Sequence, residues 1–127
     1  MQYLVRPKAP PFIDQLAEAD QQYLRRRFDA HPAELTINRD VIPWQDIAEV
    51  EVVKAARRSD LSGWFVRKVV YQEERYHVGI YYGKREKVLT NVTLGVAQFA
   101  VQAIAYYMQT PIKYTGLDDI VPTTTRD

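Results

Sequence analysis

The segment that most restricts the fold runs from Val88 to Ile112 and contains no charged side chain. Its most apolar part, Leu94 to Met108, is interrupted by glutamines and is shorter than the roughly 20 apolar residues that a membrane-spanning helix needs. We therefore expect a helix that is buried within a folded domain. Thr93 is a suitable N-cap for this helix, and Pro111 ends it.

Apolar side chains of this helix cover most of its circumference, whereas an ordinary surface helix buries a narrower stripe. Two arrangements satisfy such a helix: other elements of the same chain cover it, or a second chain covers part of it. The second arrangement predicts an interface that comprises Leu94, Phe99, Val101, Tyr107 and Met108. The first arrangement predicts a monomer, and the sequence leaves both open.

Prolines and periodic patterns divide the rest of the chain. Three prolines predict an extended arm over residues 1–11, and apolar residues at helical spacing predict a helix from Phe12 to Ala30. From residue 34 the apolar period changes to two, which predicts strands, and residues 110–127 are expected to form a tail. The expected strands are Leu35–Ile37, Val41–Trp44, Ala48–Ala55, Trp64–Gln72, Tyr76–Tyr82 and Lys87–Val92.

These elements predict a single domain of the α+β class. A bent antiparallel sheet or partly open barrel of five to six strands would pack against the apolar C-terminal helix, with the N-terminal helix outside. The chain has 127 residues, of which 46% are hydrophobic and 26% charged, as in ordinary globular domains. The expected core comprises Ile37, Val41, Trp44, Ile47, Val50, Val52, Val66, Val69, Val78, Ile80, Leu94, Phe99 and Ile104.

The segment from Leu35 to Val50 resembles bacterial pleckstrin-homology-like (PH-like) domains. Leu35-Thr36-Ile37 is followed by a turn, by Ile42-Pro43-Trp44, and then by an acidic residue and an isoleucine, Asp46-Ile47. The resemblance covers residues 34–109 and implies a sheet or barrel closed by the helix Leu94–Met108. The N-terminal helix, the smaller number of strands and the long tail depart from the family pattern. The family implies no catalysis, because its members bind headgroups, peptides or proteins, or act in assembly.

The charges of the chain are unevenly distributed, although the net charge is only +1. Residues 35–53 are predominantly acidic, whereas residues 54–87 are predominantly basic. Five cations flank one predicted loop and would converge on a phosphate or an anionic lipid headgroup if that loop folds back. They are Lys54, Arg57, Arg58, Arg67 and Lys68. Alternatively, these cations are solvated and only discourage association between sheet edges.

The sequence offers little for catalysis. It contains no cysteine, which excludes disulfides, thiol catalysis and cysteine-ligated metals. Its two histidines, His31 and His77, are separated in the sequence from the loop serines Ser59 and Ser62, so only a chance of the fold would pair a serine with a histidine. We therefore predict no catalytic, metal or cofactor site. The near-neutral net charge and the lack of an RNA-recognition motif disfavour nucleic acid as a partner.

The most economical expectation is a non-catalytic protein-interaction or assembly module. Its partner would be another protein or a second copy of the chain. A module that binds phosphate or an anionic lipid headgroup through the basic loop is the alternative. The first residues lack the apolar stretch of a signal peptide, so we expect a cytoplasmic location without a transmembrane segment.

Overall fold

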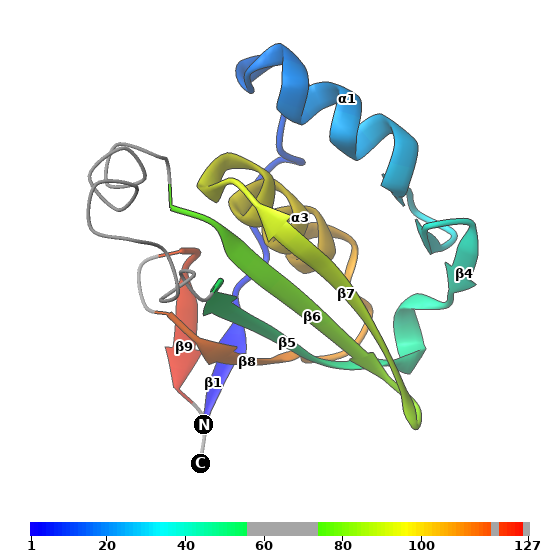
Figure 1. Cartoon of the computed structure of the whole chain (residues 1–127). Helices are drawn as coiled ribbons and strands as arrows, with labels where there is room; N and C mark the ends of the chain where they lie inside the picture. Colours follow the sequence, from blue (N-terminus) through cyan, green and yellow to red (C-terminus); the bar gives the residue numbers. More distant parts are fainter. Residues whose placement is uncertain (56–73, 118–119, 126–127) are drawn as a thin grey trace.

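The computed structural model describes residues 1–55, 74–117 and 120–125, and these residues confirm the α+β class (Figure 1). Their strands form a six-stranded sheet, in the order β7-β6-β5-β8-β1-β9, and a three-stranded sheet, β2-β3-β4. The elements are β1 (Gln2–Leu4), the 3₁₀ turn η1 (Ile13–Gln15), α1 (Glu18–Arg27), β2 (Phe28–Ala30), β3 (Leu35–Ile37), β4 (Asp40–Ile42), the 3₁₀ turn η2 (Trp44–Asp46), β5 (Ile47–Lys54), β6 (Tyr76–Tyr82), β7 (Arg85–Val92), α3 (Leu94–Tyr107), β8 (Lys113–Gly116) and β9 (Thr123–Thr125).

The six-stranded sheet is mixed, and the prediction of a purely antiparallel sheet is wrong. β8 runs parallel to β5, with Glu49 opposite Lys113, while β1 lies antiparallel between β8 and β9. The expected arm and tail therefore supply strands to the same sheet, in which β1 and β9 lie side by side (Figure 1). The described strands form no closed barrel, and the strand predicted at Trp64–Gln72 lies outside the described residues.

The predicted N-terminal helix is too long at both ends. Leu16 and Ala17 have extended backbones, with ψ of 160° and 149°, so η1 is separate and α1 begins at Glu18. At the other end, Phe28 is extended and begins β2, which pairs with β3. Phe28 is buried, so its extended conformation places an aromatic ring in the core instead of on a helix surface.

The three-stranded sheet is joined to α3 through Trp44. Asn38 and Arg39 both have positive φ, 49° and 74°, which is the conformation of a tight hairpin turn between β3 and β4. The chain then enters η2, where the Trp44 side chain is fully buried. Its indole Nε1 donates to the His31 carbonyl oxygen at 2.7 Å, and its ring stacks on Tyr107 with centroids 5.7 Å apart. The tryptophan thus fixes the small sheet to the helix.

α3 lies against one face of the sheet beside β6 and β7, and α1 lies beyond it (Figure 1). The Thr93 hydroxyl accepts the Val96 N–H at 3.2 Å, which confirms the predicted N-cap. The helix ends at Tyr107, because Met108 already has an extended ψ of 139°. The Arg6 guanidinium donates to the Met108 carbonyl oxygen, so the N-terminal segment supplies a cation to the C-terminal end of the helix.

Most of the expected core is confirmed, with two errors. Val41 is 54% exposed and Leu94 is 37% exposed, because Val41 points away from the core in β4 and Leu94 occupies the first position of α3. Phe99 is only partly buried, and Val66 and Val69 lie outside the described residues. The residues confirmed as buried are Ile37, Trp44, Ile47, Val50, Val52, Val78, Ile80 and Ile104.

Both outer strands of the six-stranded sheet carry features that discourage pairing with another strand. β9 has only three residues. In β7, Lys87 forms an ion pair with Asp40 of β4. The hydrogen bond between the two side chains raises the pKa of Lys87 above its ordinary value. The β6–β7 pairing is also irregular near Tyr76, and Asn91 has a positive φ of 56°. These edges are poor templates for an incoming strand.

Candidate functional site

The five residues of the predicted interface do not share one surface. Val101 is fully buried, so in this fold it is a core residue, and its assignment to an interface is corrected. Leu94 is exposed at the start of α3. Phe99 and Tyr107 line one groove, and Met108 lines a different cavity beside the N-terminal segment. The groove that contains Phe99 and Tyr107 is the candidate site.

The floor of this groove is a single stripe of α3. Gly95, Phe99, Ala103 and Tyr107 are spaced by four residues, which places them on one helix face. A Cβ at Gly95 would lie 3.1 Å from Cδ2 of Leu16, so Leu16 covers the first part of the stripe closely. The remaining three residues of the stripe form the floor.

Two segments from the N-terminal part of the chain form the walls. The first wall is the segment from Pro10 to Asp14, and the second consists of Arg25 in α1 together with β2. The groove between them has a volume of about 500 Å³. Phe28 contacts Phe99 edge to face, with ring centroids 6.3 Å apart, and Tyr107 stacks on Trp44. The aromatic rings of the floor are therefore held in place by packing.

Phe12 stands at the lip of the groove and is 64% exposed. Among the residues that the structure describes, no other aromatic side chain is as exposed. The prolines Pro10 and Pro11 precede it and restrict the backbone, because each fixes its own φ. An aromatic ring on a restricted segment is thus presented to solvent beside an apolar groove.

The rim of the groove carries charges of both signs. Asp14 lies on the first wall, whereas Arg25 and Asp29 lie on the second. An Arg25 Nη donates to Oε1 of Gln21 at 3.2 Å, and Nε2 of Gln21 donates to the Leu16 carbonyl oxygen at 2.9 Å. These bonds orient the guanidinium along α1. In the described part of the chain, neither Asp14 nor Asp29 belongs to an ion pair.

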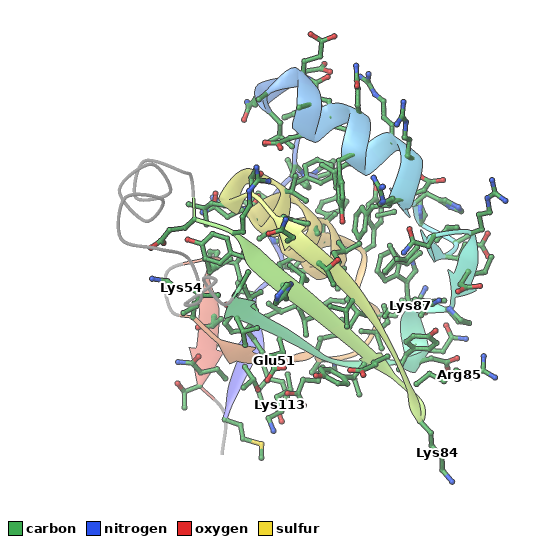
Figure 2. The ribbon with its side chains drawn as sticks, in the orientation of Figure 1. Glu51, Lys54, Lys84, Arg85, Lys87 and Lys113 are labelled. Carbon is green, nitrogen blue, oxygen red and sulfur yellow. The ribbon has the colours of Figure 1, made fainter. Side chains whose placement is uncertain are left out.

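The predicted anion site lies mostly outside the described residues, which include only Lys54 of its five cations. Nζ of Lys54 lies 3.5 Å from Oε2 of Glu74, so a neighbouring carboxylate partly neutralises it. Figure 2 shows Lys54 at one end of the sheet, with Lys84 and Arg85 at the other. The binding of phosphate or a headgroup at Arg57, Arg58, Arg67 and Lys68 stays a prediction.

A second cavity, of about 490 Å³, lies between the N-terminal segment and the end of α3. Its lining includes Arg6 and Met108, which are already joined by the bond from the guanidinium to the carbonyl oxygen. The cavity therefore surrounds a contact that holds the N-terminal segment on the helix. We regard it as part of the packing of that segment.

Outside the groove, both histidines and Tyr81 are held by hydrogen bonds to other parts of the chain. Nδ1 of His31 accepts the Ala33 N–H at 3.3 Å, and Nδ1 of His77 accepts the Asn91 N–H at 3.0 Å. The Tyr81 hydroxyl donates to Glu51 at 3.1 Å, and this hydrogen bond raises the pKa of Tyr81. Among the described residues, no three His, Asp or Glu side chains gather in a way that could hold a metal ion.

Comparison of the chain with family models, with curated proteins and with solved structures finds no match. The PH-like resemblance of residues 34–109 therefore stays a prediction. Within the described part of the chain, no helix has the length and apolar character needed to cross a membrane. The geometry of the groove is thus the main guide to function.

Proposed function

We propose that the chain is a non-catalytic protein-interaction module and that the groove over α3 is its docking surface. The observation that carries this proposal is the exposure of Phe12, 64%, at the lip of an apolar groove. Full burial of a phenylalanine side chain stabilises by about 1.5–3 kcal/mol. A partner that covers Phe12 gains much of this free energy, and buried aromatic anchors commonly dominate protein interfaces.

The groove is suited to recognition because its floor is already rigid. Phe99 packs against Phe28, and Tyr107 packs against the buried Trp44. Side chains that are ordered before binding lose little conformational entropy when a partner arrives. Binding energy from an inserted side chain therefore contributes to affinity instead of being consumed in ordering the floor.

The lining of the groove also indicates the chemistry of the partner. An apolar floor accepts a bulky apolar side chain, and a rim with both signs of charge accepts flanking charges of both signs. Asp14 and Asp29 would repel a phosphate backbone or an anionic headgroup near this floor. The occupant we propose is therefore a protein segment that inserts an apolar side chain between charged neighbours.

The same lining supports a non-catalytic role. The described lining residues include no serine, histidine or lysine, and the titratable ones are Asp14, Arg25, Asp29 and Tyr107. Tyr107 is committed to stacking on Trp44, and Arg25 is oriented by Gln21. These lining residues therefore lack the pairing of a serine or lysine nucleophile with a histidine base that many covalent mechanisms use.

Site-specific photo-cross-linking in cells tests the proposal. We expect Phe12→p-benzoylphenylalanine to form an adduct with a polypeptide, and the cross-linked peptide to contain a bulky apolar residue. The matched control is the same replacement at Val41, which is 54% exposed on β4 and does not line the groove. Arg25→Glu should lower the adduct yield at position 12 about tenfold or more, because it places like charges together at the rim. Equal yields from positions 12 and 41, or no effect of Arg25→Glu, would contradict a docking role for the groove.

A further inference from the structure

We infer that the occupant of the groove is a second copy of this chain, with Phe12 of each copy inserted into the groove of the other. This inference rests on the proposed function, because it names the partner for the same docking surface. It predicts a two-fold symmetric dimer in which one surface patch contacts itself. Three properties of the patch support this arrangement.

The first property is complementary shape on one surface. A two-fold interface needs a projection and a matching recess on the same patch, and Phe12 and the groove provide both. An apolar cavity of about 150 Å³ is large enough to bind benzene. The groove has a volume of about 500 Å³, so it accommodates the phenyl ring of a partner together with the adjacent proline.

The second property is complementary charge. Asp14 accompanies Phe12 in the first wall segment, and Arg25 belongs to the second. In the proposed dimer a two-fold axis along the groove exchanges the two walls, so Asp14 of one copy meets the wall of the other that carries Asp29 and Arg25. The contact we propose there is between Asp14 and Arg25, twice in each dimer. Neither residue is used in an ion pair within the described part of its own chain.

The third property is that the two outer strands of the six-stranded sheet are poor sites for self-association. β9 is very short, and in β7 Lys87 is paired with Asp40 while the pairing with β6 is irregular near Tyr76. Such features discourage edge-to-edge pairing between identical chains. A second copy therefore gains more by covering the groove than by extending the six-stranded sheet.

Sedimentation velocity of the purified full chain over a range of concentrations tests the inference. We expect the mass to rise with concentration from 14.8 kDa towards twice that value. Phe12→Ala should weaken the dimer by about 30-fold or more, as loss of an interface hot spot does. The control Val41→Ala removes a similarly exposed side chain outside the groove and should leave the dimer unchanged. A constant mass of 14.8 kDa, or equal effects of the two variants, would overturn the inference.

A charge exchange provides a second and more specific measurement. Arg25→Asp and Asp14→Arg should each weaken the homodimer, because each places like charges across the two-fold axis. A mixture of the two variants should form a heterodimer, because each of its two cross-axis contacts between positions 14 and 25 then pairs a carboxylate with a guanidinium. Failure of the mixture to associate more tightly than either variant alone would exclude this register.

The experiments distinguish the docking function of the groove from the identity of its occupant as a second copy of the chain. If the purified chain stays a monomer while the cross-linker at position 12 captures another protein in a manner that depends on Arg25, the second copy is excluded and the docking function stands. If neither experiment yields an adduct or a dimer, both proposals fail. A mass shift that depends on Phe12, with a cross-link between two copies, supports both.

Discussion

The two described helices have opposite characters. α3 has no charged residue and buries seven of its side chains, from Val96 to Ala105. α1 carries acidic residues in its first turn, three arginines in its last turn, and a single buried side chain, Leu24. Its charges suit the helix dipole, and the Arg27 guanidinium lies 4.5 Å from the centre of the Tyr23 ring. α3 is therefore held by burial, whereas α1 depends on few contacts.

Both helices contribute residues to the candidate groove. Its floor belongs to α3, and part of one wall belongs to α1. Segments with few buried contacts open at lower free energy than the core does. The contrast predicts a groove with a fixed floor and an adjustable wall, and the following substitutions test that contrast in order of decreasing effect.

The largest effect is expected from Val101→Asp in α3. Val101 is fully buried, so the substitution buries an unpaired carboxylate and should lower the free energy of unfolding by more than about 4 kcal/mol. Leu94→Asp is the control on the same helix. Leu94 is 37% exposed and lies at the N-terminus, where a negative charge is favourable, so its cost should stay below about 1 kcal/mol. Urea unfolding followed by circular dichroism measures both, and similar costs would refute the burial assigned to α3.

An intermediate effect is expected from Leu24→Ala in α1. Leu24 is the one buried residue of this helix, and its truncation should cost about 2–5 kcal/mol. The control Gln22→Ala alters an exposed position of the same helix and should stay within about 0.5 kcal/mol. Hydrogen exchange should show faster exchange in α1 with little change in α3. Equal acceleration in both helices would mean that they do not differ in local stability.

The smallest effect concerns the helix N-termini. Thr93 caps α3, whereas the N-cap of α1 is Ala17, which has no capping side chain. Thr93→Ala should cost about 1 kcal/mol, and Ala17→Ser should stabilise by up to about 1 kcal/mol, because Ala17 already has a suitable extended backbone. Urea midpoints measure both changes, with the exposed Thr90→Ala as the control. If Ala17→Ser proved neutral while Thr93→Ala proved costly, the missing capping side chain at Ala17 would not explain the difference between the two helix N-termini.

Elements with long, clear patterns could be predicted from the sequence. The uncharged segment Leu94–Met108 predicted α3, and the alternation in Tyr76–Tyr82 predicted β6 with its buried Val78 and Ile80. By contrast, the sequences of β1 (Gln2–Leu4) and β9 (Thr123–Thr125) do not alternate apolar with polar residues, so a period of two does not mark them. Their positions depend on pairing between the ends of the chain, which no local pattern encodes.

The candidate site was only partly predictable for the same reason. Phe99 and Tyr107 were expected at an interface because of their helix, and the spacing of four through Ala103 was available as a signal. Phe12 and Arg25 were assigned to one continuous helix instead. The extended backbone at Leu16 and Ala17 separates η1 from α1, and Phe12 and Arg25 belong to different segments of the groove lining.

The position of β1 has a consequence for the order of events during synthesis. β1 is translated before every other described element, yet its two partner strands, β8 and β9, are made last among them. The Leu4 N–H finds its acceptor, the Ile112 carbonyl oxygen, only after α3 and every described element before it have been made. Contacts of such long sequence separation form slowly. Until then the edge of β5 that receives β8 stays open on the nascent chain, and β1 has no strand to join.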